Sequence, residues 1–175
     1  MGWRFLKLSI IYTTEGIILK RFDVAEADSL FVIYTKDFGK IQARAQGVKK
    51  SEAKLKGHLE PLSLSYISFV SGRNGERLTS AILINPWPSL RNDGDRLSAA
   101  WYVAGLVGEH CMPGEKDGAL WNLLLHGLLC LEKNKFDRGD LGTFLNSFET
   151  GFCQRLGYGG RNDLDKLGHV VERPI

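Results

Sequence analysis

Apolar and polar positions alternate in short runs through the first half of the chain, which predicts β-strands. The clearest run, 62–70, buries every second side chain and leaves the others facing water. Gly-containing turns separate the runs. Five short strands within about 75 residues indicate a small barrel or sandwich. The strands are expected at 12–20, 29–35, 40–46, 62–70 and 78–84.

The second half carries the apolar spacing of helices instead. Pro86 and Pro88 cannot continue a strand, so we place a domain boundary there. The expected organisation is an extension over 1–11, a barrel domain over 12–86 and an all-helical domain over 87–175. Acidic residues that can cap helices precede three apolar stretches. The expected helices are 96–110 (capped by Asp93 or Asp95), 119–132 (Asp117) and 141–156 (Asp140).

Charge is distributed unevenly, although the net charge is only +3. Residues 1–90 contain 13 lysines and arginines and 8 acidic residues, whereas the remainder contains 10 and 12. This asymmetry favours an anionic partner for the first half, nucleic acid being the commonest. A solvated basic surface is the competing interpretation.

The basic excess is concentrated in residues 36–58, which hold seven lysines and arginines and two acids. Lys40 and Arg44 lie four apart on one expected strand and therefore share a face. A Gly- and Ser-containing loop with four more lysines follows. Such a segment can track a phosphate backbone, and its binding would depend steeply on salt. The loop lysines are Lys49, Lys50, Lys54 and Lys56.

Aromatic residues accompany the same strands. On an exposed face they could stack on bases, and inside a barrel they would be core. We expect the core role for Phe31 and Phe69 and leave the others open. The remaining aromatic residues are Tyr34, Phe38 and Tyr66.

No catalytic or metal-binding pattern stands out. Cys111, Cys130 and Cys153 are too far apart for a zinc knuckle and indicate reduced, buried thiols in a cytoplasmic protein. The four histidines are isolated from one another, and a Walker-type phosphate loop is absent. No run approaches the roughly 18 apolar residues of a membrane span. We therefore expect a protein without enzymatic activity, cofactor or metal.

Five segments, in order, resemble the RecO family of bacterial recombination mediators. The opening strand Tyr12-Thr-Thr-Glu-Gly is followed by Ala25-Glu-Ala-Asp-Ser-Leu, which is similar to the family's turn into strand two. Thr35-Lys-Asp-Phe-Gly-Lys-Ile resembles its hairpin, and Gly47-Val-Lys-Lys-Ser with Lys54-Leu-Lys-Gly-His resembles its basic loop. Leu156-Gly-Tyr resembles the end of its last matching helix.

This resemblance implies an N-terminal OB-fold barrel followed by a helical domain. It implies binding of single- and double-stranded DNA, annealing of complementary strands and loading of the recombinase on coated single strands. The implied partners are RecR, the acidic C-terminal tail of single-stranded DNA-binding protein (SSB), and in some cases RecF. The implied DNA contacts are Lys40, Arg44, Lys49, Lys50, Lys54 and Lys56.

The chain departs from the family pattern in three respects. It has no cysteine after Tyr158, where many relatives bind zinc, so we expect no zinc. Gln46 occupies a position that is often basic. The sequence also ends soon after Tyr158, where many relatives add helices that could bind partners.

Two other function classes remain open. The helical domain could act as a protein-interaction adaptor with weak or no DNA binding, or the barrel could bind RNA. Trp101 and Trp121 are expected in the core or at the domain interface. Basic residues of the helical half could meet an acidic peptide, although ordinary helix-end charge explains them better: Arg91, Arg96, Lys133, Lys135 and Arg138.

Overall fold

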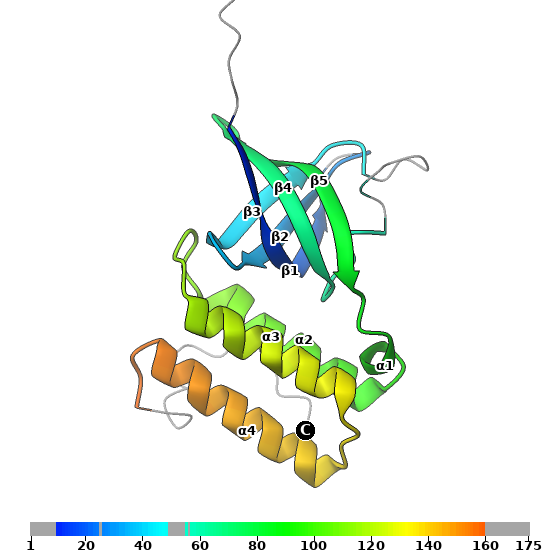
Figure 1. Cartoon of the computed structure of the whole chain (residues 1–175), viewed down its shortest axis with the longest axis vertical. Helices are drawn as coiled ribbons and strands as arrows, with labels where there is room; N and C mark the ends of the chain where they lie inside the picture. Colours follow the sequence, from blue (N-terminus) through cyan, green and yellow to red (C-terminus); the bar gives the residue numbers. More distant parts are fainter. Residues whose placement is uncertain (1–9, 25, 49–54, 56, 160–175) are drawn as a thin grey trace, which may run out of the picture.

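The computed structural model describes residues 10–24, 26–48, 55 and 57–159, and shows a β-barrel standing on a bundle of helices (Figure 1). The five strands close in the order β1-β2-β3-β5-β4. Neighbours are antiparallel except for β3 and β5, which pair in parallel. This is the OB-type architecture expected from the sequence. The strands are β1 (Ile11–Asp23), β2 (Ser29–Thr35), β3 (Gly39–Ala45), β4 (Leu64–Gly72) and β5 (Gly75–Asn85).

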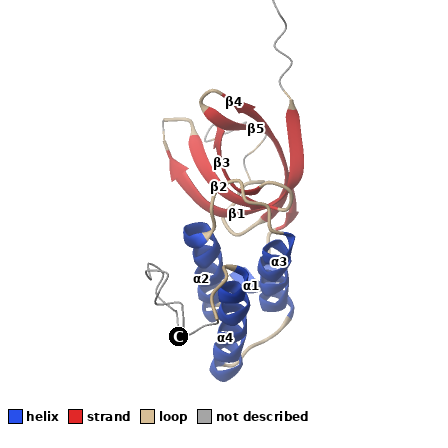
Figure 2. Cartoon of the chain, turned by 90° about the vertical axis from the view of Figure 1, so that its left-hand side faces the viewer, coloured by secondary structure: helices blue, strands red, loops and turns tan. Residues whose placement is uncertain are grey.

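In the described part of the helical half there are three long helices and a short one, and Figure 2 shows them on one side of the barrel. The three long helices were predicted, whereas the short α1 was not. Asp93 and Asp117 cap α2 and α3 as expected, because their carboxylates accept backbone N–H bonds of the first turn. The predicted cap of the last helix is wrong: Asp137 caps α4, and Asp140 lies in its first turn. The helices are α1 (Pro88–Arg91), α2 (Gly94–His110), α3 (Gly118–Lys133) and α4 (Arg138–Arg155).

The middle of β1 and most of β2 are buried on both faces. Ile18 points into the barrel, whereas Ile17 and Leu19 on either side of it pack with the helices. A bulge after Ile18 shifts the register and accommodates this arrangement. On β2, Phe31 lies inside the barrel and Tyr34 faces the helices. One hydrophobic core therefore runs from the outer wall of the barrel into the helical bundle.

Trp87 joins the two halves at the point where β5 gives way to α1. It is fully buried, and its indole N–H donates to the carbonyl oxygen of Leu62 at 2.6 Å. Both residues have a positive φ, +55° for Trp87 and +67° for Leu62. Such backbone costs about 1–2 kcal/mol per residue outside glycine. The burial of both side chains and the bond between them offset that strain.

The two other tryptophans considered from the sequence have different environments. Trp121 is buried in the core of the helical bundle, as predicted. Trp101 is 43% exposed on α2 and is not part of the hydrophobic core, so of the two places expected for it, core or domain interface, the core was wrong. Helical periodicity places both on helices, but only the packing of the bundle decides which face of α2 is covered. None of the helices in the described residues is long and apolar enough to cross a membrane.

Candidate nucleic-acid interface

Strand β3 carries the first two predicted contact residues, and the structure gives them different surroundings. Ile41, Ala43 and Ala45 point into the barrel, so Lys40, Gln42 and Arg44 point outward. Lys40 and Arg44 thus share the outer face, as expected from their spacing. Lys40 is only 9% exposed, whereas Arg44 is exposed.

Lys40 ties the barrel to the end of α2. Its ammonium group donates to the carbonyl oxygen of Gly108 at 2.8 Å. Its own carbonyl oxygen accepts the N–H of Gly114 at 2.9 Å. Because this contact holds the ammonium group within the protein, we do not include Lys40 in the proposed DNA-binding surface.

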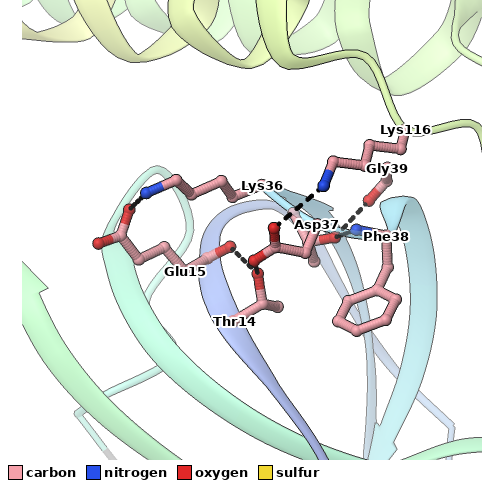
Figure 3. A network of polar contacts seen from close by, with 8 residues as sticks. Thr14, Glu15, Lys36, Asp37, Phe38, Gly39 and Lys116 are labelled. Carbon is pink, nitrogen blue, oxygen red and sulfur yellow. Dashed lines mark hydrogen bonds and ion pairs between the residues drawn. The ribbon is translucent and has the colours of Figure 1, made fainter.

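A polar network reinforces the same junction (Figure 3). The carboxylate of Asp37 accepts the hydroxyl of Thr14 at 2.8 Å and the ammonium group of Lys116 at 3.3 Å. The Thr14 bond, more than Lys116, holds the pKa of Asp37 below its usual range. Lys36 beside it contacts Glu15 at 3.4 Å. The basic residues at this end of the barrel are therefore paired within the protein.

Burial at the junction also suppresses ionisation of two nearby acids. Desolvation raises the pKa of the Cys111 thiol to about 12, and the charge of Lys40 only partly opposes this. Burial likewise raises the pKa of Tyr34 well above its ordinary value. Both groups are neutral at physiological pH, so the junction combines buried neutral side chains with the hydrogen bonds and ion pair of Lys40, Asp37 and Lys116.

The opposite end of the sheet gathers arginines. Arg44 on β3 is in register with Arg77 on β5, and the two side chains share the outer face. Arg73 lies at the tip of the β4–β5 hairpin. All three line one cleft of about 310 Å³, together with Gln46, and Glu76 is the one acid among its described lining residues. Arg77 donates to the amide oxygen of Gln46 at 3.5 Å.

These arginines have no carboxylate partner among the residues that the structure describes. Three positive charges facing one cleft raise its local potential, and an unpaired guanidinium is free to bind phosphate in a bidentate manner. In OB folds the faces of strands 2 and 3 and the β1–β2 and β4–β5 loops are the usual oligonucleotide surface. The cleft includes parts of β3 and the β4–β5 loop.

The four predicted lysines Lys49, Lys50, Lys54 and Lys56 lie outside the described residues. The chain that leads to them is placed next to the β1–β2 loop, because the carboxylate of Asp28 accepts the N–H of Gly47 at 2.9 Å. Their role remains a prediction from the sequence.

Sequence reasoning missed Arg73 and Arg77. Arg73 stands in a Ser-Gly-Arg-Asn-Gly turn between two alternating runs, which was a usable signal because OB folds bind ligands with this loop. Arg77 had no such signal. Its position beside Arg44 comes from a parallel pairing of strands that are far apart in sequence.

Aromatic residues and the helical basic residues are now placed as well. Phe31 and Phe69 are buried inside the barrel, as predicted, and Tyr34 is buried at the junction. Tyr66 is 47% exposed, on β4. Among the basic residues of the helical half, Arg96 donates to the carbonyl oxygens of Leu131, Asn134 and Ser89, and Arg91 donates to those of Pro86 and Pro61. These two arginines are structural.

Comparison with known proteins agrees with the architecture. A family model described as Recombination protein O N terminal matches residues 9–87, which include the whole barrel. The chain is 30% identical to the DNA repair protein RecO of Pelotomaculum thermopropionicum over 148 residues. The chain belongs to the RecO family.

Other RecO-family relatives match over a similar extent. Identity is 33% to the DNA repair protein RecO of Syntrophus aciditrophicus, over 84% of this chain and 56% of that protein. It is 32% to that of Alkaliphilus metalliredigens, over 80% of this chain and 56% of that protein. The match to the Pelotomaculum protein covers 85% of this chain and 56% of that protein. The chain thus spans about half the length of the curated relatives that it matches.

Proposed function

We propose that the barrel binds DNA through the cleft lined by Arg44, Arg73 and Arg77. The observation that carries this proposal is the convergence of three arginines from β3, β5 and the hairpin between β4 and β5. The lysines at 49, 50, 54 and 56, which lie outside the described residues, remain proposed DNA contacts from the sequence. Contacts of this kind go to phosphates, so the binding would lack sequence preference.

Within the RecO family, this surface would serve DNA repair by a binding mechanism. Neutralising the phosphates of two strands allows them to approach and pair, which is the physical basis of annealing without a nucleotide. Binding of single- and double-stranded DNA, annealing, and recombinase loading on SSB-coated strands are the activities that family membership suggests. RecR, the acidic tail of SSB and possibly RecF are the corresponding partners, and no enzymatic step is proposed.

The direct test is fluorescence anisotropy of a labelled poly-dT oligomer titrated at several salt concentrations. Each lost phosphate contact should lower the slope of log K against log [salt] by about 0.7. We expect Arg44→Ala/Arg77→Ala to bind more weakly and with a smaller slope. Lys49→Glu/Lys50→Glu tests the predicted loop separately. Lys133→Ala/Arg138→Ala removes two exposed cations of the helical half and is the matched control.

Unchanged binding in the Arg44→Ala/Arg77→Ala protein would reject the cleft as the site. No binding by folded wild-type protein at low salt would reject DNA binding altogether. A matched RNA oligomer that competes better than DNA would assign the site to RNA instead.

An adaptor function is the second candidate, and one surface favours it. Tyr66 and Ile82 are direct cross-strand partners on β4 and β5, and both are exposed on the outer face. Ile84 beside them is 49% exposed. Contiguous exposed apolar side chains are typical of protein contacts. A variant Tyr66→Ser/Ile82→Ser that loses repair function in cells but retains DNA binding would support this second role.

A further inference from the structure

One row of outward-facing residues crosses four strands at the end of the barrel away from the helices. The ladders pair Phe22 with Leu30, Leu30 with Arg44, and Arg44 with Arg77. Directly paired residues project from the same face of a sheet. The row thus presents two apolar side chains on β1 and β2 and two guanidinium groups on β3 and β5.

The apolar half of this row is unusual for its exposure. Phe22 is 48% exposed, and Leu30 is half-buried. At the other end of the same strands, the outward residues Val32 and Tyr34 are buried against the helices. That packing accounts for their apolar character. Phe22 belongs to neither hydrophobic cluster of the described residues and stays about half exposed.

Acidic residues beside Phe22 are partly neutralised by internal contacts. The carboxylate of Asp23 accepts the hydroxyl of Ser29 at 2.9 Å and lies 3.5 Å from the guanidinium group of Arg21. The carboxylate of Asp28 is bound to the N–H of Gly47. Glu26 remains exposed in the same loop. The row itself carries two guanidinium groups and no carboxylate.

We propose that Phe22 stacks on a base of an unpaired strand whose phosphates bind Arg44 and Arg77. Adjacent strands are about 4.8 Å apart, so Arg44 lies two steps, roughly 10 Å, from Phe22. An exposed aromatic ring beside a basic groove is how proteins hold single strands without reading sequence. In a duplex the bases stack on one another and are unavailable to the ring. Phe22 is thus the residue that favours single-stranded over double-stranded DNA.

This inference rests on the proposed function, and the test separates the two. Phe22→Ala is compared with Arg44→Ala/Arg77→Ala on three labelled probes of equal length: poly-dT, an abasic oligomer with the same phosphates, and a duplex. Tyr66→Ala is the matched control, because Tyr66 is equally exposed on a different part of the barrel. Circular dichroism and denaturant unfolding confirm that each variant is folded.

We expect Phe22→Ala to weaken poly-dT binding by about 5- to 150-fold, the range measured for loss of one stacked base. The salt slope should stay unchanged, because no phosphate contact is lost. Binding of the abasic oligomer and of the duplex should change by less than about twofold. Phe22→Trp should keep an affinity for poly-dT close to that of the wild type, because the indole ring can also stack on a base.

Three outcomes would overturn the inference. One is a poly-dT affinity that Phe22→Ala leaves unchanged while Arg44→Ala/Arg77→Ala lowers it, which keeps the proposed function. Another is an equal loss on the abasic probe, which would mean that the ring does not contact a base. A third is wild-type protein that binds none of the probes, in which case the proposed function fails with it.

Discussion

The two ends of the outer face of β2 and β3 are built alike but have different surroundings. At one end, Tyr34 pairs with Lys40, and the helical half covers both. At the other, Leu30 pairs with Arg44, and both face outward away from the helices. Each pair places an apolar residue beside a cation. The contrast teaches that a basic residue on a strand can be either a ligand contact or a domain tie, depending on what packs over it.

The covered end is expected to be the most sensitive to substitution, at Gly39. Its φ of +62° disfavours any side chain, and an added Cβ would lie 2.0 Å from the carbonyl oxygen of Glu115. Gly39→Ala should lower the free energy of unfolding by about 2–5 kcal/mol, from backbone strain and overpacking. Gly75→Ala is the control. Its φ is +89° but its surroundings are open, so it should cost about 1–2 kcal/mol. If denaturant titrations show equal losses of unfolding free energy for the two variants, the backbone around Glu115 can move to accept the added methyl group.

The next largest effect is expected from alkaline pH, which should destabilise the fold through the covered end. The pKa of Cys111 is raised from 9.0 to about 12 by burial, so the folded state holds its proton more tightly than the unfolded state. The resulting stabilisation is complete below pH 9 and is lost as the pH rises from 9 toward 12. Over this range the free energy of unfolding should fall by up to about 1.4 kcal/mol per pH unit because of this group. The raised pKa of Tyr34 should add to the loss. Cys111→Ala should flatten the profile measured by denaturant unfolding, and an unchanged profile would contradict this origin.

Exchanging each cation for methionine compares the two ends directly. Lys40→Met leaves the carbonyl oxygen of Gly108 without its donor and should cost about 1–3 kcal/mol of stability. Arg44→Met should cost less than about 0.5 kcal/mol, because the side chain is exposed. DNA binding should respond in the opposite way. Arg44→Met lowers the salt slope by about 0.7, and Lys40→Met leaves it unchanged. A lower slope in Lys40→Met would return Lys40 to the binding surface.

The smallest effect is expected at Asp37. Its pKa is lowered from 3.8, chiefly by the Thr14 hydroxyl and then by Lys116. Its charged form therefore stabilises the fold above pH 3.8, and this contribution disappears as the pH falls below that value. Asp37→Asn should lower stability at neutral pH by less than about 1 kcal/mol, since the pair with Lys116 is largely exposed. The difference from wild type should vanish in acid, and a difference that persists there would point to packing instead of charge.

The sequence by itself determined the local elements and the class of fold. Alternation along 62–70 defines the inward and outward faces of β4, and Pro86 and Pro88 end the strand region. The acidic residues before α2 and α3 determine where these helices begin. Ordered motifs indicated the RecO family. These are local signals, because backbone geometry and capping act over a few residues.

Only the tertiary structure decided which outward residues are free. Alternation shows that Lys40 and Arg44 leave the barrel on one face, but not that α2 covers one of them. Phe22 and Arg77 are 55 positions apart, and a row of strand pairings brings them onto one surface. Register and domain packing depend on contacts between distant segments, whose energies sum over the whole fold. The binding surface proposed here arises from those long-range contacts.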